Sequence, residues 1–196
     1  MKKLVISLML VLCVPFVYAE ITEFDYTISD TYVGGIFQLN GFDTLLVTGA
    51  GASDINANDD SYVEVRDTAP LDQDTGGIYG LNLNDFSTMN YYGGETYAFV
   101  IREDAIATFS GGRIDYIWSF QDSDLLKHIT FVCDVDSIDL TGNILTGNWL
   151  DSSSFSITLA DQTGYDSVYS NINFVPEPGT LILLGLGGAA LRIRKR

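Results

Sequence analysis

A weak internal repeat, marked by glycine, is the feature that most constrains how this chain folds. The glycine corners are spaced 17, 25, 17 and 18 residues apart, at Gly34, Gly51, Gly76, Gly93 and Gly111. The long interval holds an aspartate-rich insertion, Thr68–Thr75, which contains Pro70. A unit this short cannot bury its own apolar side, so successive units have to stack on one another.

Short β-branched and aromatic runs between the corners predict two or three strands in each coil. The expected strands are Ile36–Leu39, Thr44–Val47, Tyr62–Arg66, Ile78–Leu83, Thr88–Tyr91, Tyr97–Ile101, Ala105–Phe109 and Arg113–Phe120. Residues 20–120 are therefore predicted to be all-β, built of short parallel solenoid-like coils. An antiparallel β-sandwich stays open as the alternative, because strands spaced about 8–12 residues apart suit it too.

The glycine rhythm stops after Gln121, and longer runs follow at His128–Val135, Phe155–Ala160 and Val168–Val175. The last coil of a stack exposes strand edges and therefore needs a cover. Residues 121–174 are predicted to form this C-terminal β cap, with Trp149 closing the core.

The first nineteen residues have the pattern of a secretory signal. Lys2 and Lys3 precede an apolar run from Leu4 to Val17, and small or compact residues lead up to Ala19. This order of a positive, an apolar and a cleavable region predicts a signal helix over residues 1–19, removed by signal peptidase after Ala19.

The C-terminus has three parts in sequence. A stiff lead, Pro176-Glu177-Pro178, precedes the uncharged run Thr180–Leu191 and a basic end. Twelve helical residues rise about 18 Å, which is short of a hydrocarbon core of about 30 Å. The expected membrane residues are Thr180, Leu181, Ile182, Leu183, Leu184, Leu186 and Leu191, and the basic stop is Arg192, Arg194, Lys195 and Arg196. Such a basic stop favours a cytoplasmic C-terminus.

Residues 175–196, with these three parts in this order, resemble the PEP-CTERM sorting signal of bacterial exported proteins. The resemblance implies a C-terminal hydrophobic helix that anchors the chain transiently in the inner membrane. It also implies processing by an exosortase near the Pro-Glu-Pro, and a destination in the envelope, on the cell surface or in the extracellular matrix, often with exopolysaccharide.

The charge of the body limits its partners. Residues 20–174 hold 25 acidic residues against Arg66, Arg102, Arg113 and Lys127, a net charge of −21. A body this acidic repels nucleic acid and anionic lipid, so nucleic-acid binding is excluded. Cys133 is the sole cysteine of the body and alternates with apolar residues, which predicts a buried, unreactive thiol.

Residues suited to catalysis or to metal binding are sparse. The single histidine, His128, begins a predicted strand, and no Gly-x-Ser-x-Gly motif is present. Residues 54–60 resemble the start of a calcium loop, but Asp59 replaces the required glycine and Val65 the bidentate glutamate, so an Asn/Asp-rich turn is favoured. No metal site, cofactor or catalytic residue is predicted.

Two functions follow as hypotheses. The favoured one is a non-enzymatic, exported surface or matrix protein with an adhesive or exopolysaccharide-associated role. The alternative is a carbohydrate-active enzyme or a carbohydrate-binding module that acts on exopolysaccharide. The residues that could line a sugar-binding face are Tyr91, Tyr92, Tyr97, Tyr116 and Trp118, although stacking inside a coil is the commoner use of such residues.

Overall fold

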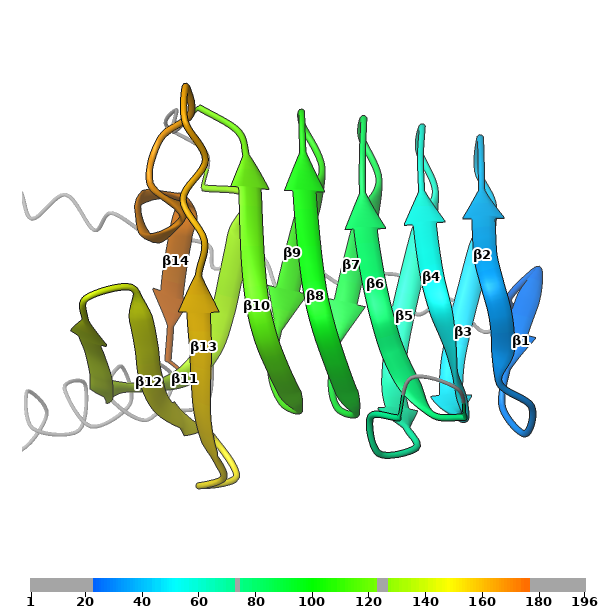
Figure 1. Cartoon of the computed structure of the whole chain (residues 1–196), viewed down its shortest axis with the longest axis horizontal. Helices are drawn as coiled ribbons and strands as arrows, with labels where there is room; N and C mark the ends of the chain where they lie inside the picture. The colour runs from blue at the N-terminus through cyan, green and yellow to red at the C-terminus, as the bar shows by residue number, and fades with distance from the viewer. Residues whose placement is uncertain (1–22, 73–74, 123–126, 177–196) are drawn as a thin grey trace, which may run out of the picture.

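A computed structural model of the chain describes residues 23–72, 75–122 and 127–176 (Figure 1). These residues form an all-β structure, as predicted. The strands are β1 (Tyr26–Ile28), β2 (Val33–Leu39), β3 (Thr44–Gly49), β4 (Gly51–Ala57), β5 (Tyr62–Thr68), β6 (Gly77–Leu83), β7 (Thr88–Tyr91), β8 (Glu95–Arg102), β9 (Ile106–Phe109), β10 (Arg113–Phe120), β11 (Ile129–Thr141), β12 (Ile144–Trp149), β13 (Ser154–Leu159) and β14 (Ile172–Val175). The predicted signal helix and C-terminal hydrophobic helix lie outside the described residues.

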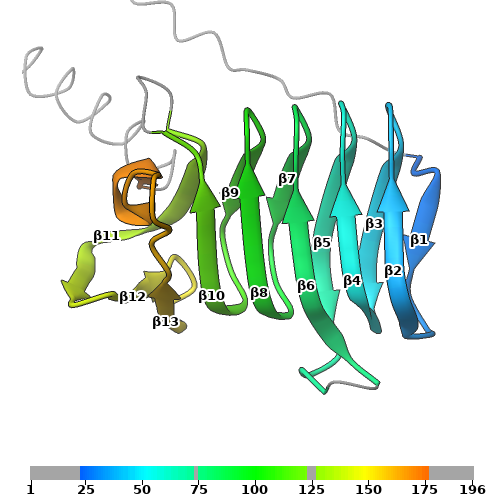
Figure 2. The same ribbon diagram turned by 45° about the horizontal axis from the view of Figure 1, so that its top comes forward.

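From β1 to β11, the strands divide into two rows that follow the parity of their numbers. β1, β3, β5, β7, β9 and β11 pair successively in parallel, and we call this row the odd sheet. β2, β4, β6, β8, β10 and β13 pair in parallel as the even sheet. The chain alternates between the two sheets, which lie one behind the other in Figures 1 and 2. Each strand from β1 to β9 therefore pairs with the strand two places further along the chain, and not with its neighbour in sequence.

Antiparallel pairing, which the sandwich alternative requires, occurs among the described strands only between β11 and β12 and between β12 and β13. These three strands belong to the C-terminal part, where β14 also pairs in parallel with β11. The part from β1 to β10 is therefore not an antiparallel sandwich.

A ladder of backbone-to-carboxylate hydrogen bonds connects the corners between the two sheets. The N–H groups of Gly41, Asp59 and Asp85 donate to carboxylates of Asp59, Asp85 and Glu103 respectively, across 18, 26 and 18 residues. All four of these residues have positive φ, between 55° and 64°. Aspartate tolerates this conformation better than most residues, and its carboxylate reaches the neighbouring corner. The interval of 26 residues spans the insertion after β5.

At the opposite corners, glycine is required because neighbouring backbones approach closely. Gly51 has φ +130°, and a Cβ atom there would lie 2.0 Å from the carbonyl oxygen of Gly77, the first residue of β6. No side chain fits in that space, and the φ value is one that other residues rarely adopt. The close approach lets consecutive strands of the even sheet begin in register at Gly51 and Gly77.

The space between the two sheets is filled by apolar side chains, many with no exposed surface. Its largest members include Tyr91, Phe99, Phe109 and Phe131. The ring of Phe109 lies 5.0 to 5.5 Å from the rings of the other three, so one aromatic contact follows the next along the axis of the stack. Stacking of like residues on like is what parallel pairing at a constant spacing produces.

Residues after β10 cover the C-terminal end of this core. Trp149 of β12 is 1% exposed and its ring lies 4.5 Å from Phe155 and 5.4 Å from Phe131. This position agrees with the prediction that Trp149 closes the core. Within the described residues, no helix combines the length and the apolar character that crossing a membrane requires.

Three strands were not predicted, namely β1, β4 and β12. β4 was missed because the segment 54–60 was interpreted as a turn, whereas its first four residues belong to β4 and only 58–61 form the corner. The prediction of a strand over Val168–Val175 was half wrong. Val168–Asn171 is a 3-10 helix, and the strand begins at Ile172.

Candidate functional site

The sorting segment follows the last strand of the fold without a spacer. β14 pairs in register with β11, from Ile172 beside Ile129 to Val175 beside Val132. The ring of Phe174 lies 5.9 Å from that of Phe131, so the strand is attached to the core. Pro176 comes directly after β14. The other predicted sorting residues, Glu177, Pro178 and everything from Thr180 to Arg196, lie outside the described residues.

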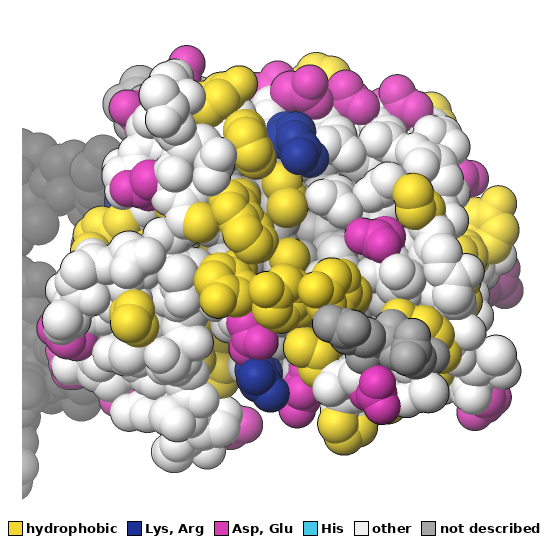
Figure 3. Space-filling model, in the orientation of Figure 1, with side chains coloured by type: hydrophobic (Ala, Val, Ile, Leu, Met, Phe, Trp, Pro, Cys, Tyr) yellow, Lys and Arg dark blue, Asp and Glu magenta, His cyan; other side chains and the backbone are white. Residues whose placement is uncertain are grey.

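A stripe of aromatic side chains crosses the outer face of the even sheet, and it is the main chemical feature of the body. We call Tyr79, Tyr97, Tyr116 and Trp118 the aromatic stripe. Each of them is partly exposed, and Figure 3 shows hydrophobic side chains gathered in front of β6, β8 and β10. No other row of ring contacts crosses the outer face of this sheet among the described residues.

The rings of the stripe are ordered by contacts between them. Tyr79 and Tyr97 stack with centroids 4.7 Å apart and planes 10° from parallel. Tyr97 meets Tyr116 at 5.2 Å with a tilt of 59°, and Tyr116 stacks on Trp118 at 5.4 Å. Offset and tilted pairs of this kind stabilise each other by about 0.5–1.5 kcal/mol. The stripe is thus held in place before any ligand arrives.

Polar groups border the stripe on the side of β4. The register places Ser53 beside Tyr79, with Asp54 on the outer face of the same strand. Because serine is small, the face of Tyr79 that is turned away from Tyr97 has no large neighbour in its row among the described residues. Asn82 donates to Asn56 at 2.9 Å one row further along. An aromatic face next to amide and carboxylate groups is the combination that binds sugar rings, which are apolar on one side and carry hydroxyl groups on their rim.

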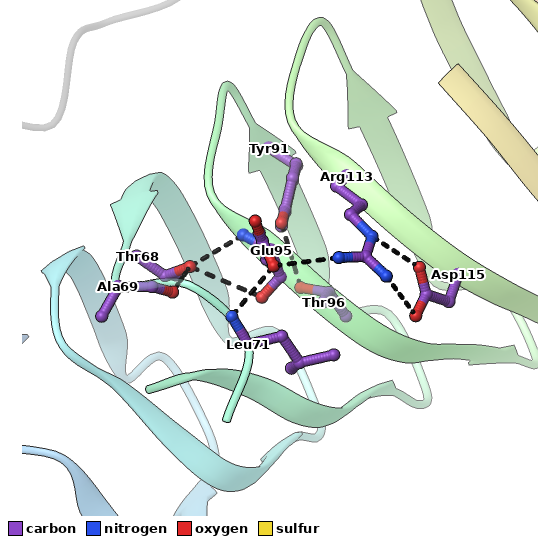
Figure 4. A network of polar contacts seen from close by, with 8 residues as sticks. All are labelled: Thr68, Ala69, Leu71, Tyr91, Glu95, Thr96, Arg113 and Asp115. Carbon is purple, nitrogen blue, oxygen red and sulfur yellow. Dashed lines mark hydrogen bonds and ion pairs between the residues drawn. The ribbon is translucent and has the colours of Figure 1, made fainter. Parts of the chain in front are cut away.

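A network of charged groups lies at the end of the stripe where β8 and β10 begin (Figure 4). Arg113 donates to both carboxylate oxygens of Asp115, at 2.9 and 3.2 Å, and to Glu95 at 3.3 Å. Glu95 also accepts a hydrogen bond from the backbone N–H of Leu71, at 2.9 Å. The two carboxylates are therefore joined through one guanidinium, an arrangement that fixes the strand ends and the insertion after β5.

The surroundings of Tyr97 in the aromatic stripe change the pKa of its phenol. The pKa of Tyr97 is raised, first by desolvation and then by its neighbours Tyr116 and Tyr79. At neutral pH the phenol of Tyr97 is therefore neutral and remains a hydrogen-bond donor.

The structure divides the aromatic residues that the sequence singled out. Tyr97, Tyr116 and Trp118 lie together in the stripe. Tyr91 does not, because it is fully buried, and its hydroxyl accepts a hydrogen bond from Thr96. Tyr92 follows β7 in the odd sheet and is 51% exposed away from the stripe. Tyr79 was missed, although its spacing of one repeat from Tyr97 is a signal that could have identified it.

The two residues considered for reactivity are both in the core. His128 is buried, with its Nδ1 atom 3.1 Å from the carbonyl oxygen of Ala105. Cys133 is fully buried as predicted, and desolvation raises the pKa of its thiol to about 11. Neither residue is placed to act on a ligand at the aromatic stripe.

The acidic segment 54–60 does not form a loop that wraps an ion. Asp54 and Asn56 lie on strand β4, and Asp59 is engaged in the corner ladder. In the part of the chain that the structure describes, no three histidine, cysteine or acidic side chains are grouped closely enough to hold a metal ion.

Comparison with known proteins identifies the C-terminal segment. Residues 174–196 match the model of the PEP-CTERM protein-sorting motif. No curated protein and no solved structure matches the chain. The match begins at Phe174, inside β14, and continues through the proline-rich lead, the apolar run and the basic end. The chain therefore carries a PEP-CTERM sorting signal at residues 174–196, which implies an exported, cell-surface-directed protein that is processed by an exosortase.

Proposed function

We propose that the protein is a non-enzymatic component of the cell surface or extracellular matrix. In this proposal its tail holds it transiently in the inner membrane until an exosortase cleaves near Pro176-Glu177-Pro178. The observation that carries the proposal is the junction at Val175, where a folded strand passes directly into the matched sorting segment. The body is a stack of coils, a β-solenoid-like form with partly polar outer faces, which suits display better than catalysis.

The proposed ligand of the displayed body is a neutral exopolysaccharide. The aromatic stripe offers a ring face at Tyr79, and Asp54, Asn56 and Asn82 offer hydrogen-bonding groups beside it. The body carries a net charge of −21, which opposes binding of an acidic polymer. A sheet face that crosses several neighbouring strands also suits an extended chain better than a single small molecule.

Mass spectrometry of the C-terminus of the exported protein tests the sorting part of the proposal. The expected C-terminal peptide ends close to Pro176-Glu177-Pro178. Recovery of exported chains that still end at Arg196 would contradict it. Replacement of Pro176, Glu177 and Pro178 by alanine provides the matched sample, in which the unprocessed tail is expected to persist.

Binding to neutral and acidic polysaccharides, measured by affinity electrophoresis, tests the ligand. Tyr79→Ala is expected to weaken binding of the neutral polymer at least about tenfold, the equivalent of about 1.4 kcal/mol. Phe86→Ala is the control, since Phe86 is 61% exposed but lies at a corner away from the stripe. Equal binding by both variants would rule out the stripe as the binding face.

The second candidate is a carbohydrate-active enzyme. The paired carboxylates of Glu95 and Asp115 beside the stripe are the observation in its favour, because glycoside cleavage uses two such groups. Their common ion pair with Arg113 weighs against it. Turnover of a panel of labelled polysaccharides by the purified protein, abolished in Glu95→Gln, would establish the enzyme and displace the non-enzymatic proposal.

A further inference from the structure

The two ends of the stack differ in how they are covered. β11, β12, β13 and β14 close the C-terminal end. At the other end, the order of described strands terminates at β1 in the odd sheet and at β2 in the even sheet. An uncovered strand edge presents unpaired backbone donors and acceptors, which native proteins normally protect with charged residues, proline or an added element.

β2 has little of this protection. Its sequence, Val33-Gly34-Gly35-Ile36-Phe37-Gln38-Leu39, contains neither a charged residue nor proline. An irregularity in its pairing lies between Val33 and Ile36, and the four residues from Ile36 onward pair regularly with β4. The carbonyl of Leu39 accepts from Asn58 of the next coil. Because backbone groups alternate in direction along a strand, those of Ile36 and Gln38 are directed to the free edge.

The same end also exposes apolar side chains. Ile36 is 65% exposed and Tyr26 of β1 is 44% exposed. The rings of Tyr26 and Phe37 meet edge to face, 5.4 Å apart, and so join the two sheets at this end. Tyr26 and Phe37 lie between the two strand edges on the core side, whereas Ile36 lies on the outer face of β2, where it alternates with Phe37 and the buried Leu39. The core and the outer face of the even sheet can therefore both continue into a partner.

The chain before β1 is too short to cover both edges. The predicted signal cleavage after Ala19 leaves three residues before Glu23, which span at most about 11 Å. β2 alone, with seven residues, is about 23 Å long. After export, the partner at this end therefore has to come from another molecule.

We propose that two copies of the exported protein associate through their N-terminal ends, in a head-to-head dimer with two-fold symmetry. A two-fold axis perpendicular to the sheets brings each sheet onto itself and reverses the direction of its strands. It therefore places β2 antiparallel to the partner's β2 and β1 antiparallel to the partner's β1 at the same time. Both sheets and the core between them continue across the interface.

The C-terminal end limits the assembly to two copies. A head-to-tail contact would repeat without limit and give a filament, but to continue both sheets it needs two open strand edges at each end of the molecule. β12 and β13 pair with each other and with β11 and β10, so the even sheet turns back on itself at the C-terminal end, and only β14 of the odd sheet has an edge there. Only the N-terminal end presents an edge of both sheets, so both sheets can continue only between two N-terminal ends.

The mass of the exported protein, purified from the cells that make it and measured by sedimentation equilibrium over a range of concentrations, tests this dimer. The wild type is expected to be a dimer, and Ile36→Lys is expected to raise the dissociation constant at least about tenfold by placing two like charges at the centre of the pairing. Ile106→Lys is the control, because Ile106 is 49% exposed but lies on β9, which is paired on both sides with β7 and β11. It is expected to dimerise as the wild type does.

Three results would overturn the proposal. They are a wild type that remains monomeric at all concentrations, a dimer that Ile36→Lys does not weaken, and species that grow beyond two copies. Thermal unfolding of each variant shows whether it is folded. If Ile36→Lys is unfolded, Gln38→Pro replaces it, because proline there removes a donor that faces the free edge and not β4. The outcome does not depend on which ligand the aromatic stripe binds.

Discussion

The indole N–H of Trp149 donates a hydrogen bond of 2.9 Å to the backbone carbonyl of Gly112. Trp149 belongs to β12, and Gly112 is the corner glycine that precedes β10. The two residues are 37 positions apart, and their contact attaches β12 to the corner before β10. The tryptophan thus contributes a directed bond as well as apolar volume.

Trp149→Phe is expected to lower the free energy of unfolding by about 2–4 kcal/mol, because the carbonyl of Gly112 loses its partner and the smaller ring leaves a void. Chemical denaturation measures the change. Leu150→Ala is the matched control, since Leu150 is the next residue and is 40% exposed. A loss in Trp149→Phe no larger than that of the control would show that the cap is held by other contacts.

Gly51→Ala is expected to prevent folding or to cost more than about 3 kcal/mol, because the added Cβ would lie 2.0 Å from the carbonyl oxygen of Gly77. Gly142→Ala separates the effect of φ from that of the close approach. Gly142 has φ +64° but no atom within 4 Å of its added Cβ, so a cost near 1 kcal/mol is expected. Equal losses in the two variants would contradict the close packing of the coils.

Asp85→Ala is expected to destabilise the fold by about 1–2 kcal/mol. It removes the carboxylate that accepts from the N–H of Asp59 and places an alanine at φ +56°. Asp85→Asn keeps an acceptor oxygen and tolerates the same φ, so it should stay within about 0.5 kcal/mol of the wild type. The ladder has no energetic role if both variants unfold at the wild-type denaturant midpoint.

Stability is expected to fall at alkaline pH because of Cys133. Burial raises the pKa of its thiol from 9.0 to about 11, so the folded state favours the protonated form. This contribution is complete below pH 9 and is lost as the pH rises from 9 to 11, by at most about 1.4 kcal/mol per pH unit. Cys133→Ala should flatten the profile between pH 9 and 11. The raised pKa of Tyr91, also caused first by desolvation, adds a fall at higher pH that this variant retains.

The sequence was most informative where the backbone conformation at one position restricts which residue types fit there. The glycine spacing predicted the all-β class and the length of the repeat, because a positive φ or a close backbone approach excludes other residues. β4 was missed because its residues Asp54 and Asn56 are typical of turns, yet pairing with β2 and β6 on both sides holds them in a strand. The neighbouring strands determine this conformation. The local sequence of β4 does not reveal which strands will pair with it.

The aromatic stripe illustrates the same limit at the level of the site. Tyr97, Tyr116 and Trp118 were selected by residue type, but so was Tyr91, whose position in β7 directs it into the core. Which side of a strand faces outward depends on the register, and an irregular alternation in β8 and β10 exposes Tyr97 with Ala98 and Asp115 with Tyr116. Such irregularities follow from the packing of the coils, which residue type alone does not reveal.

If the tail anchors the chain as proposed, the attachment of β14 to the core determines which end of the body lies nearest the bilayer. Only Pro176 to Gly179 separate Val175 from the apolar run, and four residues reach at most about 14 Å even when fully extended. In the proposed anchored state, with that run inserted, the end of the body that carries β14 lies within this reach of the lipid headgroups. The proposed head-to-head dimer places its two C-terminal ends far apart, at opposite ends of the assembly, so two copies anchored in the same membrane cannot form it. Exosortase cleavage would then have to come before dimerisation.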